Sequence, residues 1–327
     1  MEPRPDEAAV RPPGHPRLAL CIVNYFSHQG VARVLDSLRP SVLDTPVLVV
    51  CVDNSGDAQE AQRLAGVLDA HQDGVDVDVE LITAEANLGY GAGNNLAVAH
   101  ALETGVEVIV ICNPDTVFES GSLASLHREV TRGSPSIWGA TTLEDGAVLS
   151  GLSRMSAWTC RGRPIPRRGA AQVKPGALVY PDGHLMAVSA QIWRATGGFS
   201  EDFFLYYEEA DLTLRARERG IEVRTVPGFV VRHERGIATG SGEAVTQRGR
   251  AALIHASRSS VIFAATHRPG RLVCVVASRV ALAAALLARG EACRSGWVLR
   301  GAAGGLAWMW RARLSEHHGA VPAPGRR

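Results

Sequence analysis

The sequence predicts an α/β fold with a mixed, mostly parallel sheet flanked by helices. Apolar runs of strand length recur at 18–24, 47–52 and 106–112, and β-branched residues dominate them. Helical segments alternate with these runs, which is the pattern of parallel strands joined by right-handed crossovers. Polar residues that follow the runs should therefore lie at the edge of the sheet where such folds bind ligands.

The elements of the first part follow from this alternation. We expect strands at 18–24, 47–52, 78–83 and 106–112, and helices at 31–38, 57–70 and 94–102. The segment 78–83 alternates between polar and apolar residues, which predicts a strand at the edge of the sheet.

The pattern is lost between residues 141 and 183, where Arg161, Arg163, Arg167, Arg168 and Lys174 are interleaved with proline and glycine. This composition predicts a long mobile loop, either a solvated connector or a functional loop that contacts the acceptor. Beyond it we expect a strand at 184–189, a helix at 208–219 that ends at Gly220, and short strands at 223–226 and 229–232.

The C-terminal part has a different character. Residues 272–288 are almost wholly apolar, with Arg279 near the centre. Tryptophans stand beside arginines in 296–314. Tryptophan beside arginine is typical of a membrane interface, so we expect peripheral membrane contact through 272–314. A helical hairpin packed on the α/β domain is the alternative, and a spanning helix is less favoured because of Arg279.

These segments predict four regions: a disordered arm (1–16), an α/β domain (17–240), a helical extension (241–315) and a disordered tail (316–327). The balance of 34 basic against 33 acidic residues argues against nucleic-acid binding. Cysteines inside apolar runs are typical of a reducing compartment, and the N-terminus lacks the apolar segment of a secretory signal. Both observations indicate a cytoplasmic location.

The tripeptide Asn113-Pro114-Asp115 ends the fourth predicted strand. Pro114 cannot continue the strand, so Asp115 should be held at the ligand-binding edge of the sheet. Taken alone, the tripeptide is also compatible with an ordinary turn.

Two further polar clusters are expected at the same edge. Asp53 and Asn54 follow the second strand, where they can bond a nucleobase or ribose. The segment 87–95 (NLGYGAGNN) opens a helix, and its glycines and free N–H groups suit close approach to a phosphate-bearing ligand. It does not have the spacing of a dinucleotide-binding fingerprint.

Acidic residues crowd the start of the predicted helix at 208–219. Glu208, Glu209 and Asp211 lie within one turn, and Asp211 is spaced to pair with Arg215. A crowded and partly buried carboxylate has a raised pKa, which suits a general base. Whether Glu208 or Glu209 faces the crevice stays open. His233, at the end of the last strand, could join Asp115 in a Mn²⁺ or Mg²⁺ site.

Together these motifs resemble the family 2 glycosyltransferases, especially their rhamnosyltransferase-like branch. The resemblance covers residues 18–236 and depends on five motifs in order: DNS, NLGYGAGNN, NPD, GGFSEDFFLYYEEADLTLR and VRHERG. It implies a GT-A fold, a nucleotide-diphosphate sugar donor, a divalent metal and an inverting displacement.

The resemblance also implies roles for individual positions. Catalysis would belong to Glu209, with Glu208 as the other candidate base, and the metal would be bound by Asp115 and His233. The residues implied in nucleotide-sugar binding are Asn24, Asp53, Asn54, Asn87, Gly89, Gly93, Asn94, Asn113 and Asp115. The chain departs from the family at Glu209, where an aspartate is usual, and at Asn113, where the DxD motif often has an acid.

The expected activity is transfer of a sugar, with rhamnose favoured, to a hydroxyl of a cell-envelope glycan or lipid-linked acceptor. It would take place in the cytoplasm, at the inner face of the plasma membrane. The alternatives are an inactive nucleotide- or glycan-binding scaffold and, less favoured, a sugar nucleotidyltransferase, which would need a phosphate cradle where Asn24-Tyr25-Phe26-Ser27-His28 stands. The oligomeric state does not follow from the sequence.

Overall fold

The computed structural model describes residues 17–38, 44–72, 77–168, 177–234 and 242–317. The strands are β1 (Leu18–Asn24), β2 (Val47–Asp53), β3 (Val77–Thr83), β4 (Val108–Cys112), β5 (Thr116–Ser120), β6 (Ser136–Glu144), β7 (Ala147–Met155), β8 (Gly162–Pro166), β9 (Val179–Pro181), β10 (Leu185–Ser189) and β11 (Glu222–His233). The helices are α1 (His28–Ser37), α2 (Ala58–Asp69), α3 (Tyr90–Glu103), α4 (Leu123–Arg132), α5 (Ala190–Thr196), α6 (Glu208–Arg217), α7 (Gly242–His267), α8 (Leu272–Ala288) and α9 (Ala292–His317).

The predicted mixed sheet is confirmed. Its strand order is β3-β2-β1-β4-β10-β6-β11-β5, and the first four strands are parallel. β3 lies at the edge, as its alternating pattern predicts. β10 then pairs antiparallel with β4, so the second half of the sheet begins beside the turn that holds Asp115.

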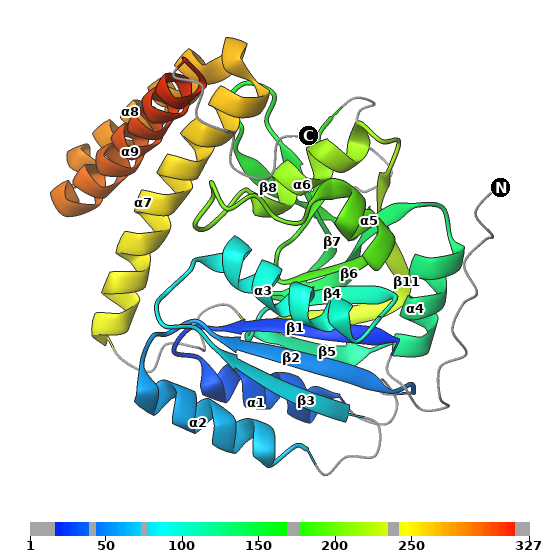
Figure 1. Cartoon of the computed structure of the whole chain (residues 1–327). Coiled ribbons are helices and arrows are strands. Elements are labelled where there is room, and N and C mark those ends of the chain that lie inside the picture. The colour runs from blue at the N-terminus through cyan, green and yellow to red at the C-terminus, as the bar shows by residue number, and fades with distance from the viewer. Residues whose placement is uncertain (1–16, 39–43, 73–76, 169–176, 235–241, 318–327) are drawn as a thin grey trace.

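Helices cover both faces of the parallel half (Figure 1). On one face, Leu20 and Ile22 of β1 are fully buried with Val34 of α1 and Leu64 of α2. The alternate residues of β1 face a second core cluster that contains α3 and α6. Shortening a buried leucine such as Leu64 to alanine costs about 2–5 kcal/mol. This two-sided burial explains why β1, β2 and β4 are apolar up to the polar residues at their carboxyl ends.

The predicted mobile loop at 141–183 is wrong for the described residues of that segment. β6 continues to Glu144, β7 pairs with it antiparallel, and β8 and β9 pair in turn with β7. β8 contains Pro164 and Pro166 and lies at an edge, where proline costs no inner hydrogen bond. Proline and arginine are common on edge strands, and this is why the composition resembled a loop.

Three other differences concern element boundaries. The two strands expected at 223–226 and 229–232 are one strand, β11, whose register shifts between Val226 and Val230, and Gly228 there has a φ of 69°. Helix α3 begins at Tyr90 rather than at residue 94, and α1 begins at His28. β5, α4 and α5 were not expected from the sequence.

Three long helices form the C-terminal extension, which lies to one side of the sheet (Figure 1). α9 packs closely along α7, and glycine permits this close contact. A Cβ atom at Gly301 would lie 2.1 Å from the carbonyl oxygen of Ile254. A Cβ at Gly305, one turn further, would lie 2.7 Å from the carbonyl oxygen of Arg258. One helical segment among the described residues, Pro269–Ala288, is long and apolar enough to cross a membrane, and 22% of it is buried.

The predicted arm 1–16 lies outside the described residues. So do residues 318–327 of the predicted tail, whereas residues 316 and 317 still belong to α9.

Candidate active site

A cavity of about 450 Å³ opens at the carboxyl end of β4, beside β10. Its walls come from the turn after β4, the hairpins of the second half of the sheet, the start of α6 and the end of β11. The predicted residues that line it are Asn113, Glu208, Glu209 and His233, and residues not singled out in the sequence include Glu144, Asp182, Tyr180 and Tyr206.

A constrained turn places the two glutamates at the start of α6. Tyr206 and Tyr207, directly before them, have φ values of 70° and 80°, which L residues rarely adopt. Tyr207 is fixed by a hydrogen bond from its hydroxyl to the carbonyl oxygen of Cys160, at 2.9 Å. Tyr206 stays 41% exposed at the cavity wall. Such strain is typical of functional sites, where the surrounding structure enforces it.

Both glutamates are buried, so neither is a solvated surface residue. The carboxylate oxygens of Glu208 have no hydrogen-bond partner among the described residues. Glu209 lies against Gly183, where a Cβ atom would come within 2.0 Å of Oε1 of Glu209. The absence of a side chain at residue 183 therefore makes room for the Glu209 carboxylate.

The environment raises the pKa of both carboxyl groups. Burial raises the pKa of Glu209 to about 7, and the nearby charge of Asp182 acts in the same direction. Burial, followed by the charges of Glu209 and Asp211, raises the pKa of Glu208 well above its usual range. Both carboxyl groups therefore hold a proton to higher pH than a solvated glutamate does, which suits proton transfer at this position.

Asp115 and His233 are brought together, as the sequence predicts. The strand pairing of β11 with β5 sets His233 opposite Thr116, and Nε2 of His233 lies 3.3 Å from Oδ2 of Asp115. Nδ1 lies 2.7 Å from Oε2 of Glu144, and the ring stacks on that of His184 with centroids 4.6 Å apart. Burial alone would lower the pKa of His233, but the contacts with Asp115 and Glu144 outweigh it and raise the pKa.

These residues fit a divalent cation as part of a mixed ligand set. Oδ1 of Asp115 is buried without a hydrogen-bond partner among the described residues, so one oxygen donor is available. Glu144 holds the far side of the imidazole in the way that outer carboxylates orient metal-binding histidines. Within the described residues, no cluster of three or more His, Cys, Asp or Glu side chains could enclose a metal. Further ligands would have to come from outside this pair.

Asn24 and Asp53 are buried at the carboxyl ends of β1 and β2, and they are partners in the sheet register. Nδ2 of Asn24 donates to Oδ1 of Asp53 at 3.1 Å and to Oε1 of Glu60 at 3.0 Å. Ser55 donates its hydroxyl to Asp53 at 2.9 Å. Next to this network, the rings of Tyr25 and Phe26 are 44% and 43% exposed. Exposed aromatic rings at a strand end suit stacking with a planar group. Two aromatic residues directly after a predicted strand are visible in the sequence, so this pair could have been singled out there.

Asn54 fixes the glycine-rich segment before α3. Its Nδ2 donates to Oδ1 of Asn87 at 3.2 Å and to the carbonyl of Gly89 at 3.0 Å, while its Oδ1 accepts from the N–H of Leu88. The glycines here make room for protein rather than leaving open space. A Cβ at Gly89 would lie 2.5 Å from the carbonyl oxygen of Phe204, which also accepts the N–H of Tyr90.

Asn94 and Gly93, two other residues predicted to bind the donor, pack against other protein atoms. Asn94 is fully buried in α3 and donates to the carbonyl of Tyr90 at 2.9 Å, and its Oδ1 has no partner among the described residues. A Cβ at Gly93 would lie 3.1 Å from the side chain of Val23. Of the predicted donor-binding residues that the structure describes, Asn113 alone lines the cavity. The others lie at the carboxyl ends of β1, β2 and β4 and around the start of α3.

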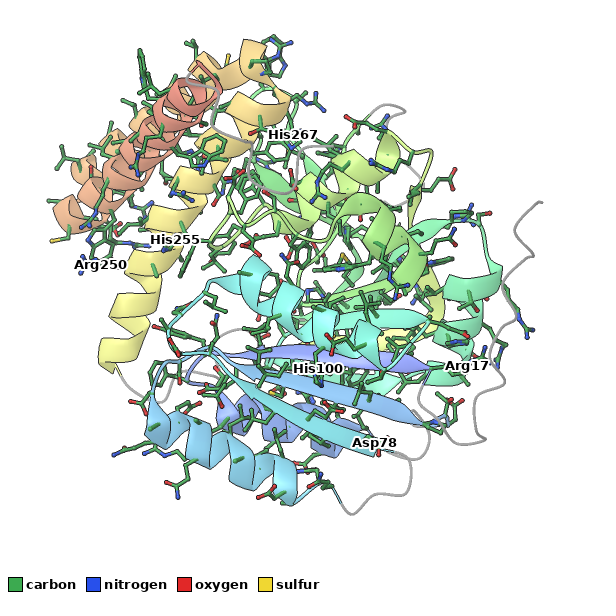
Figure 2. All side chains as sticks on the ribbon, in the orientation of Figure 1. Arg17, Asp78, His100, Arg250, His255 and His267 are labelled. Carbon is green, nitrogen blue, oxygen red and sulfur yellow. The ribbon has the colours of Figure 1, made fainter. Side chains whose placement is uncertain are left out.

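The extension contacts the loop before α6 and α6 itself, where Glu208 and Glu209 lie. His255 of α7 stacks on Phe204 with ring centroids 4.5 Å apart, and Nε2 of His267 lies 2.6 Å from Oδ1 of Asp211. Figure 2 shows both histidines on α7. Nε1 of Trp308 in α9 donates to Oδ1 of Asp202 at 3.0 Å. The position of the acidic pair therefore depends on the helical extension as well as on the sheet.

Comparisons with known proteins agree with this architecture. Residues 15–253 match the family model described as "Glycosyltransferase like family 2". The chain is 27% identical over 255 residues to the N-acetylglucosaminyl-diphospho-decaprenol L-rhamnosyltransferase of Mycobacterium tuberculosis, a match that covers 68% of this chain and 78% of the relative. It is 25% identical over 213 residues to the low-salt glycan biosynthesis hexosyltransferase Agl10 of Haloferax volcanii, covering 63% of each chain.

A solved structure shows the same fold. The crystal structure of GalNAc-T7 with UDP, GalNAc and Mn²⁺ superposes with a TM-score of 0.52 and 11% sequence identity, over 74% of this chain and 48% of that one. The sheet and its flanking helices thus form a GT-A fold, to which α8 and α9 add a helical extension beyond the part that the family model matches.

Proposed function

The chain belongs to glycosyltransferase family 2, and on that premise we propose that it transfers a sugar from a nucleotide-diphosphate donor to a hydroxyl group with inversion. The observation that carries this proposal is one cavity lined by both Glu209 and His233. A base and a site for the leaving diphosphate on two walls of one cavity are what an in-line displacement requires.

Glu209 is the proposed general base. The acceptor hydroxyl oxygen forms a bond to the anomeric carbon while its proton moves to the carboxylate of Glu209. The bond between that carbon and the diphosphate oxygen breaks, and the nucleoside diphosphate leaves with the electron pair. The pKa of about 7 matches this task, because efficient bases titrate near the working pH. Glu208 is the alternative base at the same site.

Asp115 and His233 are the proposed ligands of Mn²⁺ or Mg²⁺, with Glu144 orienting His233. When bound, such an ion would neutralise charge on the departing diphosphate. Asn113 at the same turn lines the cavity and is placed to bond the donor. Its amide is a weaker metal ligand than the acid that many relatives have, so the diphosphate would complete the ligand set.

The nucleoside half of the donor is proposed to bind at the ends of β1 and β2. Asp53 and Asn24 would contact the base or ribose, with the exposed rings of Tyr25 and Phe26 beside them. Asn54, Asn87, Gly89, Gly93 and Asn94 would act mainly by fixing the shape of this wall, because their side chains or Cβ positions face other protein atoms.

We infer that the acceptor enters past Tyr206. Its exposed ring lies on the cavity wall next to the glutamates, and sugar rings stack well on aromatic faces. The similarity to a rhamnosyltransferase favours rhamnose as the sugar and a lipid-linked glycan as the acceptor. Such an acceptor would place the enzyme in the cytoplasm at the inner face of the plasma membrane.

A thermal-shift panel of nucleotide sugars with and without Mn²⁺ tests the proposal. A donor that binds the folded state raises the midpoint of unfolding through mass action. We expect dTDP-rhamnose or another nucleotide sugar to do so more strongly with Mn²⁺, and to be cleaved to the nucleoside diphosphate when acceptor is present. Binding without any cleavage would indicate a scaffold, and no binding by any member of the panel would contradict the proposed function.

A further inference from the structure

The outer face of α8 is a continuous apolar surface. Every exposed residue of this helix is alanine, valine or leucine, and the largest are Val273, Val280 and Leu287, which are 80%, 52% and 59% exposed. A helix of 17 residues is about 26 Å long, so the strip is much longer than a scattered apolar contact. Long apolar strips of this kind mark sites of protein or membrane interaction.

The inner face of α8 packs on the rest of the extension. Val275, Ala283 and Leu286 are buried, and so is Arg279 near the middle of the helix. A spanning orientation would have to expose this face, including a guanidinium group, to lipid. The helix therefore suits a position in the plane of a membrane surface, with one face buried in it.

The charge of the helical extension indicates which kind of partner this surface would bind. Between Arg268 and Leu314 the sequence has eight arginines and a single acid, Glu291. Arg289, Arg294, Arg300 and Arg311 are exposed at the ends of α8 and along α9. Although Arg289 and Arg294 pair with Glu291, the extension has a net positive charge, which disfavours self-association. Anionic lipid headgroups, in contrast, attract it.

Exposed tryptophans lie near the start of α8, at one end of the apolar strip. Trp310 in α9 is 64% exposed, and α9 returns alongside α8 so that its last turns lie near the start of α8. At this same end Trp158 is 58% exposed, and the guanidinium of Arg271 lies 3.7 Å from the centre of its ring. Tryptophan and arginine together are enriched where an apolar surface meets headgroups.

We propose that the outer face of α8, with the exposed arginines and Trp310, docks the protein in the plane of an anionic lipid bilayer. α7 lies between this hairpin and the cavity, and Ala256 of α7 lines the cavity itself. Docking would thus fix the cavity at a set distance from the membrane surface. The surface does not depend on the transfer reaction, so it can be tested without a nucleotide sugar.

The test is co-sedimentation of the full chain with vesicles of phosphatidylcholine alone or mixed with phosphatidylglycerol. We expect binding to the anionic vesicles, weakened by salt, and at least a tenfold loss of affinity in the double variant V280E/L287E. V148E is the matched control, because Val148 is 46% exposed on β7, outside the extension. If the glutamate variant does not fold, V280N/L287N replaces it, with the unfolding midpoint as the check.

Three outcomes would overturn the proposal: no binding to anionic vesicles, equal binding by the double variant, or equal binding to neutral and anionic vesicles. A dimer in light scattering that the double variant converts to a monomer would also overturn it, since α8 would then be covered by a second copy. Vesicle binding without catalysis would leave this proposal standing and count against the proposed function alone.

Discussion

Nε2 of His233 lies 3.3 Å from Oδ2 of Asp115, although one residue ends β11 and the other follows β4. The antiparallel pairing of β11 with β5 creates this contact, and the bond from His233 to Glu144 fixes the ring. His233 lines the cavity that contains the acidic pair, and the carboxylate of Asp115 is held directly beside its imidazole.

This arrangement predicts how divalent ions act on the protein. In E144Q the concentration of Mn²⁺ that half-saturates the nucleotide-induced thermal shift should rise about 10- to 100-fold. Removal of an outer partner of a metal-binding histidine typically lowers metal affinity by about that factor. D115N should raise it further. D78N is the control, because Asp78 is exposed on the edge strand β3 (Figure 2). An unchanged Mn²⁺ response in D115N would exclude Asp115 as a ligand.

The buried position of Glu209 predicts a dependence of turnover on pH. A pKa of about 7 leaves this carboxyl protonated at lower pH, so kcat should rise with pH and level off above about 7. D182N removes a neighbouring negative charge and should move the midpoint of the profile to lower pH. A midpoint that D182N does not shift, or shifts upward, would contradict the assigned electrostatics.

Burying Glu209 should also cost stability at high pH. Its folded pKa is raised above that of the unfolded chain, so its stabilising contribution is complete below about pH 4.5 and is lost as the pH rises through about 7. Relative to the wild type, E209Q should gain on the order of 1–3 kcal/mol of unfolding free energy between pH 5 and pH 8. Urea unfolding at the two pH values measures it, with E103Q as the exposed control. A gain of the same size in E103Q would mean that the effect is not specific to the buried site.

Tyr206 should act on the acceptor rather than on the donor. Y206G permits the observed φ of 70° but removes the ring, so the KM for acceptor should rise while the KM for donor stays constant. Y206A removes the ring and keeps the strain of about 1–3 kcal/mol. Y206A should therefore show the same rise in acceptor KM as Y206G, and its unfolding midpoint should be lower than that of Y206G. Y206F should restore the acceptor KM, and a donor defect of equal size in Y206G would argue against an acceptor contact.

The parallel half of the fold could be predicted because its strands are buried on both faces. Residues 47–52 of β2 are accordingly all apolar, and only Asp53 at the carboxyl end of the strand is polar. In the second half, β10, α6 and β11 were predicted, whereas the strands β7, β8 and β9 were not. β8 pairs with β7 at an edge, where Pro164 and Arg163 are tolerated, so its pattern is that of a loop.

The same distinction applies to the site. Asp115, Glu209 and His233 occur in local motifs that the resemblance covers. Glu144, Asp182 and Gly183 lie in the segment without a pattern and reach the site through long-range strand pairing. Nor could the sequence decide between Glu208 and Glu209. The charges that act on Glu208 lie in the same helical turn, whereas Asp182 is brought near Glu209 only in three dimensions.

The most direct test of the proposed mechanism compares E209Q with E208Q. For the nucleotide sugar that stabilises the protein most, release of nucleoside diphosphate is measured in the presence of Mn²⁺ and acceptor, together with the donor-induced thermal shift. We predict that E209Q loses about 10²- to 10⁴-fold in kcat and keeps the donor-induced shift, as expected for removal of a general base. Full activity in E209Q, together with loss of activity in E208Q, would contradict the assignment of Glu209 as the base.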